Sequence, residues 1–190
     1  MADKFVWLCF VGDLEGVQAA LQSGTDVNSK DEPHGKTGLM MALEGKHVHC
    51  SGKHTAVIRL LLEQEGIDIN ICDNYGQTAL HWAAKFAKNS KCIAILLAHP
   101  ELTSQTVNKK NIWGYTPLLS AVWGGGAGCV QVLINDARTD LNIKNDYGES
   151  PLMFAVKRNY VGCAALLLPH PRVDLMTRDA YERSGEEVKR

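Results

Sequence analysis

The sequence predicts an all-α solenoid, a stack of helix-turn-helix units, because one motif recurs along the chain at a nearly constant interval. In each copy a glycine stands two residues before a threonine or serine and an apolar stretch follows; the clearest copies are Gly76-Gln-Thr78, Gly114-Tyr-Thr116 and Gly148-Glu-Ser150. Intervals of 41, 38 and 34 residues separate Thr37, Thr78, Thr116 and Ser150. The unit is therefore about 33 to 34 residues long, with insertions in the second and third copies.

Each residue type in this motif has a physical reason to be there. Glycine readily adopts the left-handed backbone of a tight turn. The hydroxyl group of threonine or serine can cap a helix start by accepting a backbone N–H. Pro117 and Pro151 then fill the first helical turn, where a missing N–H does no harm. The motif thus predicts a turn followed at once by a helix, and several stacked copies complete a shared core.

These copies, with the residues that follow them, resemble the ankyrin repeat. That repeat opens its first helix on Thr-Pro-Leu-His and ends its second helix on Leu-Leu before Asp-Val-Asn. Thr78-Ala-Leu80-His81 matches the opening, and Leu61-Leu62 with Asp68-Ile-Asn70 matches the ending. Residues 12–28 match the pattern without Thr-Pro, as an end repeat often does. The resemblance implies β-hairpin loops between helix pairs, and it assigns His81 to hydrogen bonds between turns.

The resemblance predicts one ankyrin repeat domain over residues 1–178. The five repeats are expected at approximately 3–30, 31–72, 73–110, 111–144 and 145–178. Residues 179–190 begin like a sixth copy, but Glu182 replaces the turn glycine and Glu186 replaces an apolar leucine. We expect them to form either a solvent-facing C-terminal cap or the start of a truncated sixth repeat.

Composition favours a soluble domain inside the cell. The chain has 190 residues, 45% hydrophobic content and a formal net charge of −1, which gives no overall attraction to nucleic acid or to an acidic membrane surface. No apolar run approaches the roughly 18 residues of a membrane span, and the N-terminus lacks the apolar core of a signal peptide. We expect a monomer in the cytoplasm or nucleus that binds neither nucleic acid nor membrane.

Three of the six cysteines occupy one register of the repeat. Cys92, Cys129 and Cys163 lie 13 or 14 residues beyond the threonine or serine of their copy. Such a shared position predicts small, buried apolar side chains at the start of the second helix. We expect these residues to be free thiols in a reducing compartment.

One loop contains residue types found in metal sites, and one glycine-rich turn resembles a phosphate-binding loop in composition. The insertion in the second repeat holds His47, His49, Cys50 and His54, which are donors that zinc accepts. Their irregular spacing favours an exposed polar loop, so no cofactor and no metal are expected, and these four residues are the candidates if a metal binds. Gly124-Gly-Gly-Ala-Gly128 lacks the Lys-Ser/Thr ending and the preceding strand of a phosphate-binding loop.

No grouping of residues indicates an enzyme. The carboxylates are scattered over loops, and no nucleophile stands in a recognisable pattern with a histidine and a carboxylate. The resemblance also argues against catalysis, because ankyrin stacks do not rely on their repeats for it. The family resemblance leaves two interpretations open, hydroxylation or plain hydrogen bonding in loops, for Asn28, Asn70, Asn108 and Asn142.

The resemblance places a concave face around the turn glycines and the ends of the first helices. Aromatic side chains gather at these positions, followed by two cations: Tyr75, Phe86, Trp113, Tyr115, Trp123, Tyr147, Lys157 and Arg158. Exposed aromatic residues and arginine dominate binding hot spots, and a contiguous apolar patch marks a partner site. The alternative is that Trp113 and Tyr115 merely pack along neighbouring hairpins.

The sequence therefore predicts a protein-protein interaction module or scaffold that binds a partner protein through its concave face and hairpin tips. A second hypothesis is an inhibitory or regulatory subunit that blocks an enzyme or transcription factor. It would need charged contacts on the end repeats, such as Lys36, Glu149, Lys157 and Arg158. A third hypothesis is an enzyme or metal sensor built on the histidine-rich loop.

Overall fold

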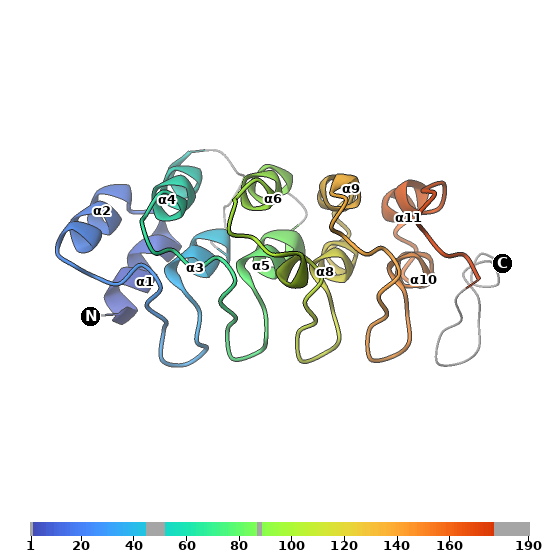
Figure 1. Ribbon diagram of the computed structural model, residues 1–190, viewed down its shortest axis with the longest axis horizontal. Helices are drawn as coiled ribbons and strands as arrows, with labels where there is room; N and C mark the ends of the chain where they lie inside the picture. Colours follow the sequence, from blue (N-terminus) through green and yellow to red (C-terminus); the bar gives the residue numbers. More distant parts are fainter. Residues whose placement is uncertain (1, 45–51, 87–88, 177–190) are drawn as a thin grey trace.

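The computed structural model describes residues 2–44, 52–86 and 89–176, and these ranges form two parallel rows of helices (Figure 1). The inner row holds the first helix of each pair: α1 (Ala2–Val11), α3 (Gly38–Glu44), α5 (Ala79–Lys85), α8 (Pro117–Trp123) and α10 (Pro151–Lys157). The outer row holds the second: α2 (Leu14–Gln22), α4 (Lys53–Leu62), α6 (Ser90–Leu97), α9 (Ala127–Asn135) and α11 (Val161–Leu167). A single turn, α7 (Ser104–Val107), lies in the connection that follows α6.

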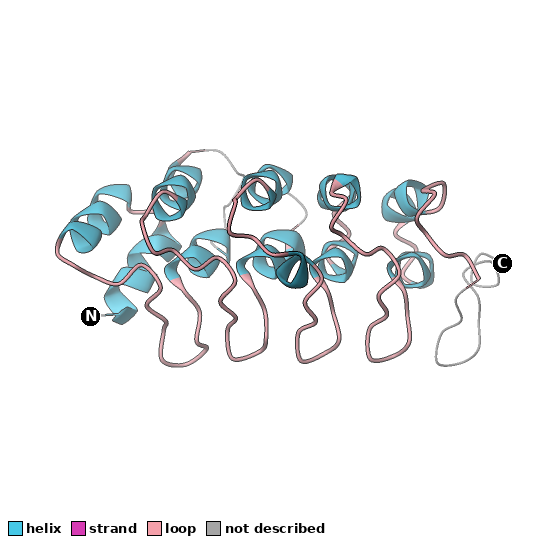
Figure 2. Ribbon diagram, viewed as in Figure 1, coloured by secondary structure: helices cyan, strands magenta, loops and turns pink. Residues whose placement is uncertain are grey.

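Long loops project from the inner row, one between each helix pair and the next (Figure 2). We call them fingers. Within the described ranges they contain no strand, only isolated bridges that pair Lys30 with Thr37 and Cys72 with Thr78. The all-α solenoid is confirmed, and the predicted hairpins exist as hydrogen-bonded loops rather than as paired strands. The repeat boundaries stay a prediction, and residues 179–190 lie outside the described ranges.

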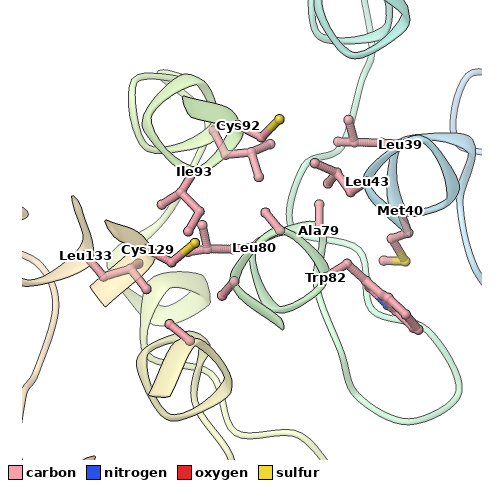
Figure 3. Close-up of a cluster of buried hydrophobic side chains, with 14 of the residues drawn as sticks. Leu39, Met40, Leu43, Ala79, Leu80, Trp82, Cys92, Ile93, Cys129 and Leu133 are labelled. Carbon is pink, nitrogen blue, oxygen red and sulfur yellow. The ribbon is translucent and has the colours of Figure 1, made fainter. Parts of the chain in front are cut away.

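The core is one continuous layer between the two rows, because each helix pair is apolar on the sides that face its neighbours. Figure 3 shows Leu43 of α3, Ala79 of α5 and Ile93 of α6 gathered between their helices. One leucine position of the outer row is completely buried in four successive repeats, at Leu61, Leu96, Leu133 and Leu167. Every repeat therefore depends on its neighbours for burial.

We expect Leu96→Ala to lower the free energy of unfolding by about 2 to 5 kcal/mol, because it removes a fully buried side chain and leaves a cavity. Urea denaturation followed by circular dichroism measures the change. Val161→Ala is the control: its side chain is 69% exposed, and the cost should stay near about 0.5 kcal/mol. Equal costs for the two variants would contradict the placement of Leu96 in the core.

Helix starts follow the predicted chemistry. The hydroxyl of Thr116 accepts the N–H of Leu119 at 3.2 Å, and Ser150 accepts the N–H of Met153 at 3.4 Å. Pro117 and Pro151 occupy the first helical positions of α8 and α10. The predicted capping role of the threonine and serine is therefore confirmed.

Each finger closes on itself, and hydrogen bonds also join the fingers of the second, third and fourth repeats to one another. Asn111 N–H donates to the carbonyl of Tyr115 at 2.9 Å across the base of its finger. Ile112 N–H donates to the carbonyl of Tyr75 in the preceding finger at 3.0 Å. These three fingers thus form a hydrogen-bonded row rather than independent loops.

The turn glycine is required by close approach as well as by backbone conformation. Gly114 has a φ of +74°, and a Cβ added to it would lie 2.5 Å from the backbone nitrogen of Asp146 in the next finger. Gly24 also has a positive φ, +88°, but nothing lies within 4 Å of the corresponding Cβ position. A comparison of Gly24 with Gly114 therefore separates the cost of the left-handed backbone from the cost of a clash with the next finger.

Gly24→Ala should cost about 1 to 2 kcal/mol of folding free energy, the price of a left-handed alanine. Gly114→Ala should cost roughly 1 to 3 kcal/mol more, because the new methyl group collides with the next finger. Chemical denaturation of both variants tests this difference. Similar costs would mean that the fingers can separate without loss.

His81 ties one repeat to the next. Its Nδ1 accepts the N–H of Thr78 at 3.1 Å, while its Nε2 lies 3.0 Å from the carbonyl oxygen of Tyr115 and donates to it. Burial lowers the pKa of the imidazole to about 4, so the ring is neutral at pH 7. The turn-to-turn role that the resemblance assigns to His81 agrees with these contacts.

The lowered pKa predicts a pH-dependent loss of stability. In the unfolded chain the imidazole titrates near about 6.5, so acid favours the unfolded state. The contribution of His81 is fully present above about pH 6.5 and declines as the pH falls toward 4, by up to about 3 kcal/mol. Urea denaturation at several pH values should show a shallower pH dependence for His81→Gln. Parallel curves for the two proteins would contradict this role.

Asparagines at the ends of the repeats form a ladder of contacts between neighbours. Asn28 donates its amide to the carbonyl of Gly66 at 2.8 Å, and its Oδ1 accepts the N–H of Asp68 at 2.9 Å. Asn108 and Asn142 contact the following repeat in the same way, through the carbonyls of Arg138 and Arg172. We call this set, with Asn70, the asparagine ladder. Hydroxylation of these residues stays a prediction.

Two arginine side chains donate hydrogen bonds to backbone carbonyls of the preceding repeat. The guanidinium of Arg138 donates to the carbonyls of Leu97 and Leu102 at 2.6 and 3.0 Å, which satisfies the C-terminal end of α6. Arg172, one repeat later, donates to the carbonyl of Ile134 at the end of α9. The repeat pattern in the sequence does not predict these arginine contacts.

The cysteine predictions are partly corrected. Cys92, Cys129 and Cys163 are buried in the second helices of their pairs, as predicted. Cys129 and Cys163 are free thiols, whereas Cys92 is disulfide-bonded, so the expectation of a free thiol there is wrong. Burial as a small side chain does not prevent a thiol at a helix start from bonding to another sulfur.

Candidate functional site

An aromatic row runs across the fingertips. Tyr75 and Trp113 occupy equivalent positions in neighbouring fingers and stack with ring centroids 5.7 Å apart and an interplanar angle of 15°. His34 extends the row, with its ring 6.1 Å from that of Tyr75. Trp113 is 47% exposed and Tyr147 in the next finger is 60% exposed. The rings therefore pack on one another and are presented to solvent at the same time.

A pocket of about 310 Å³ opens behind this row, where the fingers of the third, fourth and fifth repeats meet the inner helices. Aromatic rings and short polar side chains make up most of its wall. The lining residues are Gln77, Lys85, Asn111, Trp113, Tyr115, Ser120, Trp123 and Tyr147. We call this the aromatic pocket.

The structure brings four of the predicted site residues to the aromatic pocket and holds others elsewhere. Trp113, Tyr115, Trp123 and Tyr147 line it. Tyr115 is half-buried, with its ring edge-on to Phe154 at 5.7 Å, and burial raises the pKa of its phenol. Tyr75 supports Trp113 from the preceding finger.

The remaining aromatic candidate, Phe86, has a different place. It caps the C-terminal end of α5, is half-buried against the core, and is not among the residues that line the pocket. Its backbone carbonyl lies 3.4 Å from Sγ of Cys129. Phe86 is thus a supporting residue beneath the concave face.

Charged candidates on the concave face are mostly engaged in contacts within the chain. Lys36 bonds to Glu44 at 2.6 Å and is only 7% exposed. Glu149, 3% exposed, forms an ion pair with Lys157. Arg158 lies over the ring of Phe154 with its guanidinium carbon 5.4 Å from the centroid. Lys36 and Glu149 were expected as surface contacts, and their burial corrects that expectation.

Four pocket residues lie outside the predicted set of site residues: Gln77, Lys85, Asn111 and Ser120. Asn111 shapes the finger, since its Oδ1 accepts the N–H groups of Trp113 and Tyr115, both at 3.0 Å. Ser120 enters from α8 at the repeat position where α5 has Trp82. The signal for Ser120 was available: a small polar side chain at a position that is a large ring in the neighbouring repeats leaves room for a cavity.

The predicted metal candidates cannot be assembled from the described residues. His47, His49 and Cys50 lie outside the described ranges. His54 is described, and its Nε2 lies 3.0 Å from the carbonyl oxygen of Phe10. Among residues 2–44, 52–86 and 89–176, no three histidine, cysteine or acidic side chains form a group that could hold a metal ion.

The described helices are 4 to 10 residues long. In the part of the chain that the structure describes, none of them combines the length and the apolar character needed to cross a bilayer.

The paired helices, fingers and asparagine ladder define a helical repeat protein of the solenoid class. The sequence model of ankyrin repeats in three copies matches residues 5–106 and 100–179. The chain therefore belongs to the ankyrin repeat family, whose fold is typically non-catalytic and whose repeats generally bind other proteins.

Individual relatives cover parts of the chain. A protein of Rickettsia bellii (strain RML369-C) that carries the name ankyrin repeat protein is 35% identical over 129 residues, 67% of this chain and 64% of its own length. The human transient receptor potential cation channel subfamily A member 1 is 27% identical over 121 residues, which are 64% of this chain and 10% of the channel. The Drosophila melanogaster neurogenic locus Notch protein is 30% identical over 156 residues, 74% of this chain and 6% of Notch.

A solved structure shares the whole fold. The crystal structure of EF0377, an ankyrin repeat protein, superposes with a TM-score of 0.81 over 99% of this chain and 90% of that chain, at 22% sequence identity. This likeness concerns the fold alone. The chain spans less than two thirds of the length of the three relatives above, so their activities as whole proteins do not transfer to it.

Proposed function

We propose that this chain is an interaction module or scaffold that binds another protein through the aromatic pocket and the fingertips. The observation that carries the proposal is the exposure of Trp113, Trp123 and Tyr147 around one cavity, at 47%, 47% and 60%. Large exposed rings around a concavity are typical of binding hot spots. Because each finger is closed by its own hydrogen bonds and the finger of Trp113 is bonded to that of Tyr75, little ordering is required when a partner binds.

The proposed contact residues are those of the aromatic row and pocket, with the cations at the last inner helix alongside: Tyr75, Trp113, Tyr115, Trp123, Tyr147, Lys157 and Arg158. Phe86 supports the face from below. We further propose that the chain is not an enzyme and acts as a monomer in the cytoplasm or nucleus. Its helices and its small net charge give no reason to invoke a membrane or nucleic acid partner.

The inhibitory or regulatory subunit remains the alternative form of the same binding activity. It was expected to use charged contacts on the end repeats. The ion pairs Lys36–Glu44 and Glu149–Lys157 already occupy most of these charges, which leaves Arg158 as the available one. The aromatic pocket therefore supports a general interaction module better than a charged blocking surface.

The double variant Trp113→Ala/Trp123→Ala should weaken binding of a partner by about 2 to 4 kcal/mol, because two exposed anchor rings are lost. Its folding stability should change much less. The measurement is a pull-down from cell lysate with both proteins, read by mass spectrometry, after their thermal melting curves have been compared.

Trp7→Ala is the matched control, since Trp7 is 57% exposed on α1 at the other end of the stack. Partners that bind the wild type and the Trp7 variant but not the double variant support the proposal. Partners retained by the double variant would move the site away from the pocket. Unfolding as severe as that of Leu96→Ala would instead identify the rings as core.

A further inference from the structure

One pair of positions recurs on the concave face of every finger-containing repeat. The first position follows the turn glycine, and the second lies eight residues later at the end of the inner helix. The four pairs are Lys36 with Glu44, Gln77 with Lys85, Tyr115 with Trp123, and Glu149 with Lys157. We call them the finger–helix pairs.

In the first and last of these finger–helix pairs, the two side chains form an ion pair. Lys36 Nζ meets Glu44 Oε2 at 2.6 Å, and Lys157 meets Glu149 with the signs exchanged between the two positions. The geometry of this site is therefore suited to a contact between a lysine and a carboxylate, whichever position supplies the lysine.

The third repeat breaks the pattern. Gln77 stands where a carboxylate would complete the pair, and its amide donates to Asp73 at 3.3 Å instead. Lys85 forms no ion pair with any described residue. Its ammonium group lies between two indoles, 5.0 Å from the ring centroid of Trp82 and 5.6 Å from that of Trp123. The lysine is thus positioned by aromatic contacts and keeps its charge uncompensated.

The buried carboxylate of the same finger, Asp73, is already fully hydrogen-bonded. Asp73 is 6% exposed, and its oxygens accept the N–H groups of Tyr75 and Gln77 at 2.9 and 2.8 Å and the indole N–H of Trp82 at 3.0 Å. These bonds hold it inside the finger. Of the residues that line the aromatic pocket, Lys85 alone carries a charge at neutral pH.

We propose that the aromatic pocket binds an acidic segment of the partner protein, in which a glutamate or aspartate pairs with Lys85 and a neighbouring large apolar side chain packs against Trp113, Trp123 and Tyr147. This inference rests on the proposed function and specifies the chemistry of the partner. The partner carboxylate takes the place that Glu149 holds beside Lys157 and that Glu44 holds beside Lys36.

Charge and geometry decide against other occupants. A cationic side chain would be repelled by Lys85, even though aromatic rings alone attract cations. A phosphate group is usually met by an arginine fork or by several donors, whereas this pocket offers one lysine. A carboxylate needs only the single point charge that is present.

The test selects a display library of random linear peptides separately on the wild type, Lys85→Gln, Lys85→Glu and Trp113→Ala/Trp123→Ala. Peptides enriched on the wild type should carry glutamate or aspartate beside an aromatic or large aliphatic residue. The acidic bias should vanish on Lys85→Gln and turn to a basic bias on Lys85→Glu.

Affinity of one enriched peptide, measured by fluorescence anisotropy, refines the result. Lys85→Gln should weaken it on the order of tenfold, while Lys85→Arg, which keeps the charge, should weaken it less. Lys91→Gln makes the same charge change on the exposed surface of α6 and should leave the affinity unchanged. Added salt should weaken the wild type and leave Lys85→Gln almost unaffected.

The outcomes separate the two proposals. Peptides that require Trp113 and Trp123 but show no acidic bias, or the same bias on Lys85→Glu, overturn the inference and leave the binding site in place. Peptides that bind the double tryptophan variant as well as the wild type count against the proposed function itself. Failure to enrich any peptide on the wild type also overturns the inference, and the pull-down then decides the proposed function alone.

Discussion

The register of the whole stack depends on one repeated contact, the asparagine ladder. A single amide side chain donates to a carbonyl and accepts an N–H of the following repeat, so it fixes both the distance and the orientation between neighbours. Apolar packing alone is non-directional and would allow helix pairs to slide. With the register fixed, the leucines of successive outer helices meet and the fingers fall side by side.

Recognition depends on this regularity because the concave face is assembled from equivalent positions. Rings that are far apart in the sequence, such as Tyr75 and Trp113, stack only because their fingers are held in register. A change at one such position alters the surface without altering the core beneath it, since each repeat contacts only its neighbours. The aromatic pocket arises where the inner-helix position of Trp82 and Phe154 is occupied in the fourth repeat by Ser120.

Much of the fold could be predicted because the motif is local. The caps at Thr116 and Ser150 and the positive φ of the turn glycines depend on residues within one copy. The contact of His81 with the next copy was assigned by the family resemblance. Side-chain contacts, both within a copy and between copies, were harder to predict. The closure of Lys36 and Glu149 in ion pairs, the arginine contacts of the outer loops and the disulfide at Cys92 depend on side-chain directions that a one-dimensional pattern does not contain.

The two charged finger–helix pairs are arranged in opposite order on the concave face. At one end the finger carries the positive group and the helix the negative one, and at the other end the order is reversed. Their dipoles therefore point in opposite senses across the same groove. A half-turn about the normal to the face exchanges these two ion pairs and restores the same charge pattern, so they alone do not distinguish the two directions of a bound chain. Lys85 has no charged counterpart at the equivalent positions of the fourth repeat, Tyr115 and Trp123, and it breaks that symmetry. The two polarities of an extended chain lying along the stack would therefore meet different potentials because of this one lysine.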